Sequence, residues 1–141
     1  MKWIILTEND LERLVMFDRD VHPPCDHVTV DEYKHWIVSG VVFMVLVDLT
    51  GDWIGSVQVL KTDECATFFG FGIKPAVQGK GYSKTLMKYL QRFSRKWDLR
   101  CKTRETNVVM QTLLRASKFI HDGDSFECGE SWQSWVKYKQ T

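Results

Sequence analysis

The stretch 77-VQGKGYS-83 decides how this chain folds. It follows the apolar run 68-FFGFGIKP-75, which predicts a strand, and it precedes the amphipathic run 84-KTLMKYLQRFSRKW-97. The second run places its apolar residues at spacings of four, three and four, as one face of a helix requires: Leu86, Leu90, Phe93 and Trp97. A loop with two glycines therefore connects a predicted strand to a predicted helix.

Such a loop is suited to an anion. The first backbone N–H groups of a helix have no partners, and with the positive end of the helix dipole they attract negative charge. Gly79 and Gly81 let a ligand approach the backbone, because glycine has no Cβ. The loop lacks both the GxxxxGK[ST] pattern of mononucleotide sites and the GxGxxG pattern of dinucleotide sites. By spacing alone it is a weak phosphate signal.

Apolar periodicity around this loop predicts one α/β domain that spans residues 1–141. We expect strands at 2–6, 41–48, 53–61, 67–74 and 99–104, and two strand-like pieces within 127–139. We expect four helices, three after the caps Thr7, Thr29 and Asn107 and one after the glycine loop. The helix after Asn107 is expected to extend to Ile120. No linker or repeat divides the chain.

Composition limits the class of protein. An apolar content of 44% over 141 residues is ordinary for one globular domain. The longest apolar run, Val41 to Val47, is too short to cross a bilayer, and the first residues do not form a secretory signal. We therefore expect a cytoplasmic protein without a membrane partner, with its four cysteines reduced: Cys25, Cys65, Cys101 and Cys128.

The segment 22-HPPCDH-27 offers three residue types that bind zinc, namely His22, Cys25 and His27. A structural zinc site takes four ligands, usually from paired knuckles, and no second knuckle is present. The segment predicts a polar loop bent by its prolines, so we expect no metal.

Charge is unevenly distributed along the chain. The segment 74–104 carries ten basic residues and one acid, a net charge of +9, while the rest of the chain carries −8. This asymmetry favours an anionic partner for the basic segment and a cationic one for the acidic first third, although a solvated helix face remains an alternative.

With its context, 71-FGIKPAVQGKGYS-83 resembles the coenzyme A loop of the GNAT family of N-acetyltransferases. The family pattern Gln/Arg-x-x-Gly-x-Gly/Ala falls on Gln78, Gly81 and Ser83, where serine replaces the usual glycine or alanine. The asparagine that the family places at the start of the next helix is Asn107, within 105-ETNVVMQTLLRASKF-119. The resemblance covers the chain and implies a mixed, mostly antiparallel central sheet flanked by helices.

The resemblance also implies a donor, acetyl-coenzyme A (acetyl-CoA), and residues that bind it. Main-chain groups of the loop would hold its pyrophosphate, Phe71, Gly72 and Ile73 would pair with the pantetheine arm, and Asn107 would bond that arm. The backbone N–H of Ile73 would stabilise the oxyanion. The implied coenzyme-binding residues are Phe71, Gly72, Ile73, Gln78, Gly79, Lys80, Gly81, Tyr82, Ser83 and Asn107.

Two catalytic positions depart from the family pattern. The family often has a glutamate five residues before its asparagine, where this chain has Lys102, and a tyrosine acid seven residues after it, where this chain has Leu114. Glu105 and Glu64 are the remaining candidates for a general base, and both are also readable as solvated strand-end acids.

The resemblance implies an N-acetyltransferase that moves an acetyl group from acetyl-CoA to a primary amine by direct attack. The acceptor, a small molecule or a protein, stays unidentified, and the protein is expected to be a monomer or homodimer. Two alternatives remain: a non-catalytic acyl-CoA-binding module of the same fold, and a nucleic-acid-directed protein that uses the basic segment 74–104.

Overall fold

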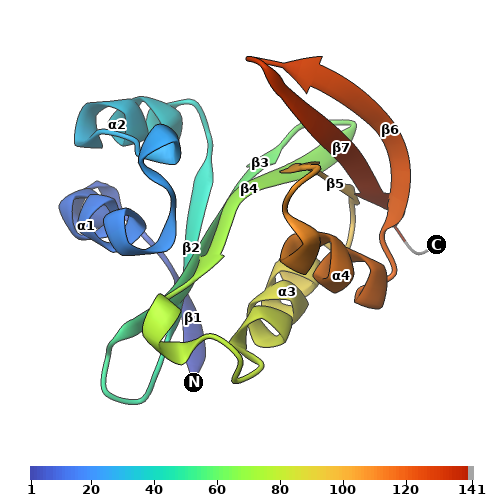
Figure 1. The fold of residues 1–141 in the computed structure, drawn as a ribbon. Helices are drawn as coiled ribbons and strands as arrows, with labels where there is room; N and C mark the ends of the chain where they lie inside the picture. Colours follow the sequence, from blue (N-terminus) through green and yellow to red (C-terminus); the bar gives the residue numbers. More distant parts are fainter. Residues whose placement is uncertain (140–141) are drawn as a thin grey trace.

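The computed structural model describes residues 1–139 as one sheet of seven strands with helices on both faces (Figure 1). The strands lie in the order β1-β2-β3-β4-β5-β7-β6. Their bounds are β1 Lys2–Ile5, β2 Val42–Val47, β3 Trp53–Lys61, β4 Cys65–Ile73, β5 Asp98–Arg104, β6 Ile120–Glu127 and β7 Glu130–Lys137. The helices are α1 Leu11–Val21, α2 Val30–Val38, α3 Tyr82–Phe93 and α4 Val108–Ala116.

Every strand pair is antiparallel except β4–β5, which is parallel. This confirms the predicted fold class, a mixed and mostly antiparallel sheet flanked by helices. None of the helices within residues 1–139 is long and apolar enough to cross a membrane.

Strand β2 shows why the sheet is covered on both faces. Phe43 and Val45 belong to the core under α1 and α2, whereas Met44 and Leu46 belong to the core under α3 and α4. Because both faces of this strand are buried, its sequence is continuously apolar rather than alternating. Figure 1 shows the two helix pairs on opposite sides of the sheet.

Helix α2 begins with the capping box that its sequence predicts. The Glu32 N–H donates to Thr29 Oγ1 at 3.2 Å, and the Thr29 N–H donates to the Glu32 carboxylate at 3.3 Å. Both groups would otherwise be unsatisfied donors at the helix start.

We expect Thr29→Ala to lower the free energy of unfolding by about 1 kcal/mol, because it removes the acceptor for the Glu32 N–H. Thr29→Ser keeps that oxygen and should match the parent protein. Urea unfolding followed by circular dichroism measures both variants, and an unchanged midpoint for Thr29→Ala would show that the cap contributes nothing.

The C-terminal third differs from the sequence-based prediction. Helix α4 ends at Ala116, and Ile120 begins strand β6 instead of closing the helix. The stretch 127–139 holds a turn and one strand, β7, rather than two strands. β6, with the sequence IHDGDSFE, is largely exposed at the edge of the sheet. It therefore lacks the apolar alternation by which strands are found.

The two parallel strands diverge soon after they pair. β4 and β5 are in register over three residue pairs only, from Cys65↔Asp98 to Thr67↔Arg100. Further along, β4 pairs only with β3 and β5 only with β7 among the described residues. The facing edges of β4 and β5 therefore leave a slot bordered by unpaired backbone groups, which we call the β4–β5 slot.

Candidate active site

Backbone direction makes the end of β4 a donor into the β4–β5 slot. The Lys74 N–H bonds to the Ile54 carbonyl of β3 at 2.8 Å. Successive N–H groups of a strand point to opposite edges, so the Ile73 N–H points away from β3 and toward the slot. A bulge precedes this point, since Gln58 pairs with Phe69 but Ser56 pairs with Gly72.

The glycine loop lies at the same end of β4. The Gln78 side-chain amide donates to the Ile73 carbonyl at 3.2 Å, which ties the loop to the strand. Gly79 and Gly81 have φ of +79° and +84°, and nothing lies within 4 Å of where their Cβ atoms would stand. The loop therefore requires glycine for its backbone and is open to a ligand.

The loop leads directly into α3. Gly81 is the N-cap of this helix, and no side chain caps it. The first N–H groups of α3, those of Tyr82, Ser83 and Lys84, therefore face the loop as donors. A 12-residue helix adds its dipole to these donors. The arrangement is suited to a phosphate group held by backbone contacts, with Lys80 beside it in the loop.

Asn107 begins α4 at the end of the diverging strand β5. Its Oδ1 accepts the Met110 N–H at 3.1 Å, so the oxygen is used as a helix cap. An asparagine amide also carries two donors, and the NH₂ group has no partner among the described residues. One side chain can thus cap the helix and still donate to a ligand in the slot.

The two candidate bases are separated by the fold. Glu105 directly follows β5 and donates its backbone N–H to the Ser131 carbonyl at 3.0 Å. Glu64 lies in the turn before β4, nine residues from Ile73, or about 30 Å at about 3.3 Å per extended residue. Glu64 therefore cannot act on a group bound at Ile73, and only Glu105 lies at the same end of the slot.

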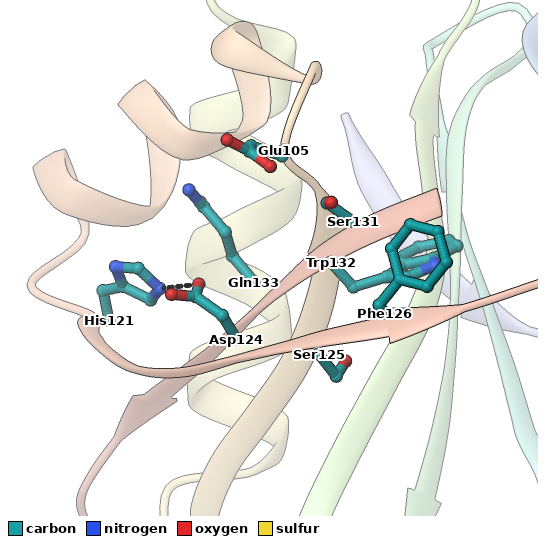
Figure 2. A pocket seen from close by; sticks show the side chains of 8 residues that line it. All are labelled: Glu105, His121, Asp124, Ser125, Phe126, Ser131, Trp132 and Gln133. Atoms are coloured by element: carbon teal, nitrogen blue, oxygen red, sulfur yellow. Dashed lines mark hydrogen bonds and ion pairs between the residues drawn. The ribbon is translucent and has the colours of Figure 1, made fainter. Parts of the chain in front are cut away.

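Glu105 lines a pocket of about 430 Å³ between the start of α4 and the β6–β7 hairpin (Figure 2). In Figure 2 the Gln133 amide lies between Glu105 and the pair His121–Asp124, whose atoms Nε2 and Oδ1 are 2.7 Å apart. Phe126 and Trp132 border the other end of this pocket.

Three basic residues of β5 are neutralised by acids from later strands and from the α1–α2 connection. Arg100 pairs with Asp122 at 2.9 Å and Lys102 with Glu127 at 3.0 Å. The basic segment therefore acts as a free positive field mainly along α3. There Lys84 and Lys88 share a groove of about 340 Å³ with Lys118 and Lys137. Burial lowers the pKa of Lys137.

Arg104 joins the α1–α2 connection to β5. Its guanidinium donates to both Asp26 oxygens at 2.7 and 2.6 Å, donates to Glu130 at 3.2 Å, and stacks over Trp132. The hydrogen bond from Arg104 lowers the pKa of Asp26. We call this set the Arg104 clamp, and it fixes the connection over the end of β5.

The sequence-based reasoning missed a buried polar cluster where α1 reaches β4. His22 and Val21 pack over Gly72 so closely that any Cβ at this glycine would overlap them. His22 Nε2 lies 3.9 Å from Oδ1 of Asp18, which is 3% exposed, and Tyr33 donates its hydroxyl to Oδ2 of the same carboxylate. In the sequence, only the i, i+4 spacing of Asp18 and His22 indicates that these two side chains lie together.

His22, Cys25 and His27 do not converge on a metal. Within residues 1–139 no three His, Cys, Asp or Glu side chains lie close enough together to hold one. His27 Nε2 instead contacts the His22 carbonyl at 2.8 Å, and the Cys25 thiol lies beside Asp26.

The model of the acetyltransferase (GNAT) family matches residues 10–119 of the chain. The protein belongs to the GNAT acetyltransferase family. The matched region contains the glycine loop, the β4–β5 slot and Asn107.

Solved structures share the GNAT fold over nearly the whole chain. The ribosomal-protein-S18-alanine N-acetyltransferase from Escherichia coli has a TM-score of 0.87 at 13% identity, covering 99% of this chain and 94% of that one. A chimera of the Vibrio cholerae spermidine N-acetyltransferase SpeG and hSSAT has a TM-score of 0.82 at 17% identity, covering 99% and 96%. A GNAT family acetyltransferase from Bacillus cereus has a TM-score of 0.79 at 20% identity, covering 99% of this chain and 98% of that one.

At these identities the likeness concerns the fold. No curated protein matches the sequence significantly.

The GNAT position that usually carries a tyrosine acid lies in the core of this protein. Leu114 is 0% exposed and packs in the cluster under α3 and α4. The leaving group in this family is a thiol with a reference pKa of about 8.5, so departure without an acid at pH 7 forfeits only about 2 kcal/mol. Leucine has no proton to donate, so this position cannot supply an acid.

Proposed function

We propose that the protein transfers the acetyl group of acetyl-CoA to a primary amine by direct attack of the amine on the thioester. The main support for this proposal is that the β4–β5 slot and the glycine loop meet at the end of β4. The Ile73 N–H points into the slot, and the open backbone of Gly79 and Gly81 follows at its end. A thioester with a phosphate-bearing arm fits such an arrangement.

Each part of the site has a role in this proposal. Backbone groups of Gln78 to Ser83, with Lys80 nearby, hold the pyrophosphate at the start of α3. Phe71, Gly72 and Ile73 bond the pantetheine arm as an added strand would. The Ile73 N–H donates to the thioester oxygen as negative charge develops there. The basic groove beside α3 attracts the remaining phosphate of the donor.

Two similar structures and the acids near the first two helices support an amine as the acceptor. Of the two structures with the highest TM-scores reported above, one acetylates a ribosomal protein alanine and the other is a spermidine N-acetyltransferase. Within residues 18–26 of the acidic first third, Asp18 and Asp26 are paired with Tyr33 and Arg104, and Asp20 is exposed. We therefore propose an amine acceptor without choosing between polyamine and protein N-terminus.

Two substitutions of Asn107 separate its effect on stability from its effect on CoA binding. Asn107→Asp keeps the oxygen that caps α4 but loses the NH₂ donors, so we expect near-parental stability and weaker CoA binding by about 1 kcal/mol for one lost hydrogen bond. Asn107→Ala should lose both, with about 1 kcal/mol of stability as well. Calorimetric titration with CoA and thermal melting measure the two quantities. Unchanged affinity in both variants would leave Asn107 as a helix cap alone.

A second function is favoured by one observation, the buried Leu114 in place of an acid. A non-catalytic module would hold acyl-CoA through the same loop and slot without turnover. The nucleic-acid alternative has less support, because Tyr89 and Phe93 pack against Trp3 at 6.3 and 5.7 Å between ring centroids and present no stacking surface.

Release of the CoA thiol tests the proposal. Purified protein is mixed with acetyl-CoA and, in separate reactions, with spermidine, a peptide that begins with alanine, and a peptide with an internal lysine. We expect amine-dependent thiol release with at least one acceptor. Tight acetyl-CoA binding without release in any reaction would support the non-catalytic module.

A further inference from the structure

The α1–α2 connection crosses the β4–β5 slot from one border to the other. At one side His22, just past the end of α1, packs over Gly72 of β4. At the other side Asp26 is held by the Arg104 clamp at the end of β5. The residues between these two anchors therefore span the diverging strands. A side chain that points inward from this connection faces a ligand bound in the slot.

His22 is that side chain. Its ring atoms Cε1 and Nε2 would lie within 2.9 and 3.2 Å of a Cβ at Gly72, so the ring covers the backbone next to Ile73. One residue along an extended strand is about 3.3 Å, so the imidazole lies over the residue next to the N–H that points into the slot. The side chain is 16% exposed, so it is shielded from bulk water and still accessible.

Asp18 has the geometry of an orienting partner. Its Oδ2 accepts the Tyr33 hydroxyl, while its Oδ1 has no hydrogen bond among the described residues and faces His22 Nε2 at 3.9 Å. Burial raises the pKa of Asp18, and the bond from Tyr33 opposes that shift. A buried carboxyl group with one free oxygen is suited to orient the neighbouring ring through that oxygen.

The other charged groups near the His22 ring have partners of their own. His27 contacts the His22 carbonyl through its own Nε2 at 2.8 Å, and Asp26 is paired with Arg104. Asp18 is therefore the carboxylate that faces the imidazole directly. Nε2 is the ring nitrogen that contacts Asp18, so Nδ1 is the nitrogen that remains for a proton from the acceptor.

We propose that His22 is the general base of the acetyl transfer, with Asp18 as the residue that positions it. This inference rests on the proposed function. The ammonium of the acceptor passes one proton to His22 Nδ1, because an imidazole both accepts and releases protons near neutral pH. The freed nitrogen pair forms the C–N bond at the thioester carbon.

The remaining electrons and protons balance without another reactant. The carbonyl pair moves onto the oxygen, near the Ile73 N–H, and returns as the C–S bond breaks with its pair on sulfur. The second proton of the nitrogen goes to the thiolate, directly or through water. The products are the N-acetyl amine, the CoA thiol and one proton, which His22 releases to solvent.

A matched pair of amines tests whether His22 acts as a base. Ethylamine is protonated at pH 7 and needs proton removal, whereas 2,2,2-trifluoroethylamine is largely unprotonated and does not. We expect His22→Gln to lower kcat for ethylamine by about a hundredfold or more, which is within the range of general-base catalysis. For trifluoroethylamine we expect kcat to fall by less than about threefold, because this amine needs no base to remove a proton before attack. The KM for acetyl-CoA should be unchanged.

Two further variants complete the test. Asp18→Asn keeps an acceptor for Tyr33 but removes the charge, and it should lower kcat by about tenfold with the same sparing of trifluoroethylamine. His35→Gln replaces an exposed histidine of α2 and should change nothing. The loss in His22→Gln should also shrink as the pH rises toward the pKa of ethylamine itself, which a structural role would not produce.

Each other outcome is decisive. Equal losses with both amines, an unchanged kcat in His22→Gln, or a raised KM for acetyl-CoA with kcat kept would overturn the base assignment while leaving acetyl transfer intact. If the parent protein acetylated neither these two amines nor the acceptors tested above, the proposed function would fail and this inference with it. Circular dichroism confirms that each variant is folded before its rates are compared.

Discussion

Gly81→Asp should abolish CoA binding while the protein stays folded. Gly81 has a φ of +84°, caps α3, and has open space where a Cβ would stand. The substitution puts a negative charge at the helix N-terminus, where the loop would otherwise attract phosphate. We expect a loss of affinity of at least about a hundredfold, or about 2.7 kcal/mol, in a calorimetric titration.

Two control variants separate charge from backbone strain. Gly81→Asn has nearly the same shape without the charge, and asparagine tolerates positive φ, so its affinity should fall much less. Gly51→Asp introduces the same residue at another open glycine with a φ of +89°, in the β2–β3 turn, and should leave CoA affinity unchanged. Parental affinity in a folded Gly81→Asp protein would show that the loop does not hold phosphate.

Gly70→Ala should be the most destabilising single-methyl change near the site. Gly70 forms the bulge of β4 with a φ of +63°, and its Cβ would overlap the side-chain amide of Gln58, which is 3% exposed. Left-handed backbone costs a non-glycine residue about 1–2 kcal/mol, and overpacking adds about 1–3 kcal/mol. We therefore expect the free energy of unfolding to fall by about 2–5 kcal/mol.

A double-mutant cycle distinguishes the two causes of this loss. In a Gln58→Ala background the overlap is absent, so Gly70→Ala should cost only the backbone strain of about 1–2 kcal/mol. Urea unfolding of the four proteins provides the cycle. An equal cost in both backgrounds would mean that Gln58 is not what excludes a side chain at Gly70.

The sequence predicts those parts of the fold in which local chemistry and tertiary packing agree. The Thr29 cap, the two-sided burial of β2 and the strand–loop–helix unit around Gly81 each carry a local signature. Strand β6 carries none, because an exposed polar edge strand is defined by its partner β7 and not by its own apolar pattern.

The candidate site divides in the same way. The glycine loop is recognisable because its backbone needs particular residues at fixed spacing. The His22 cluster is not, because Asp18 and His22 at i, i+4 suggest an exposed helix pair until α1 is placed against Gly72. The separation of Glu64 from Ile73 likewise depends on which end of β4 each residue occupies.

A single-turnover experiment with protein in excess over acetyl-CoA tests the central claim most directly. Spermidine or the alanine-starting peptide is added, and the CoA thiol and the N-acetyl amine are quantified from the same sample by mass spectrometry. Acetyl transfer predicts that the two products appear together in equal amounts and that neither forms with Gly81→Asp protein. Acetyl-CoA that remains bound and intact with every amine, or thiol released without N-acetyl product, would contradict the account.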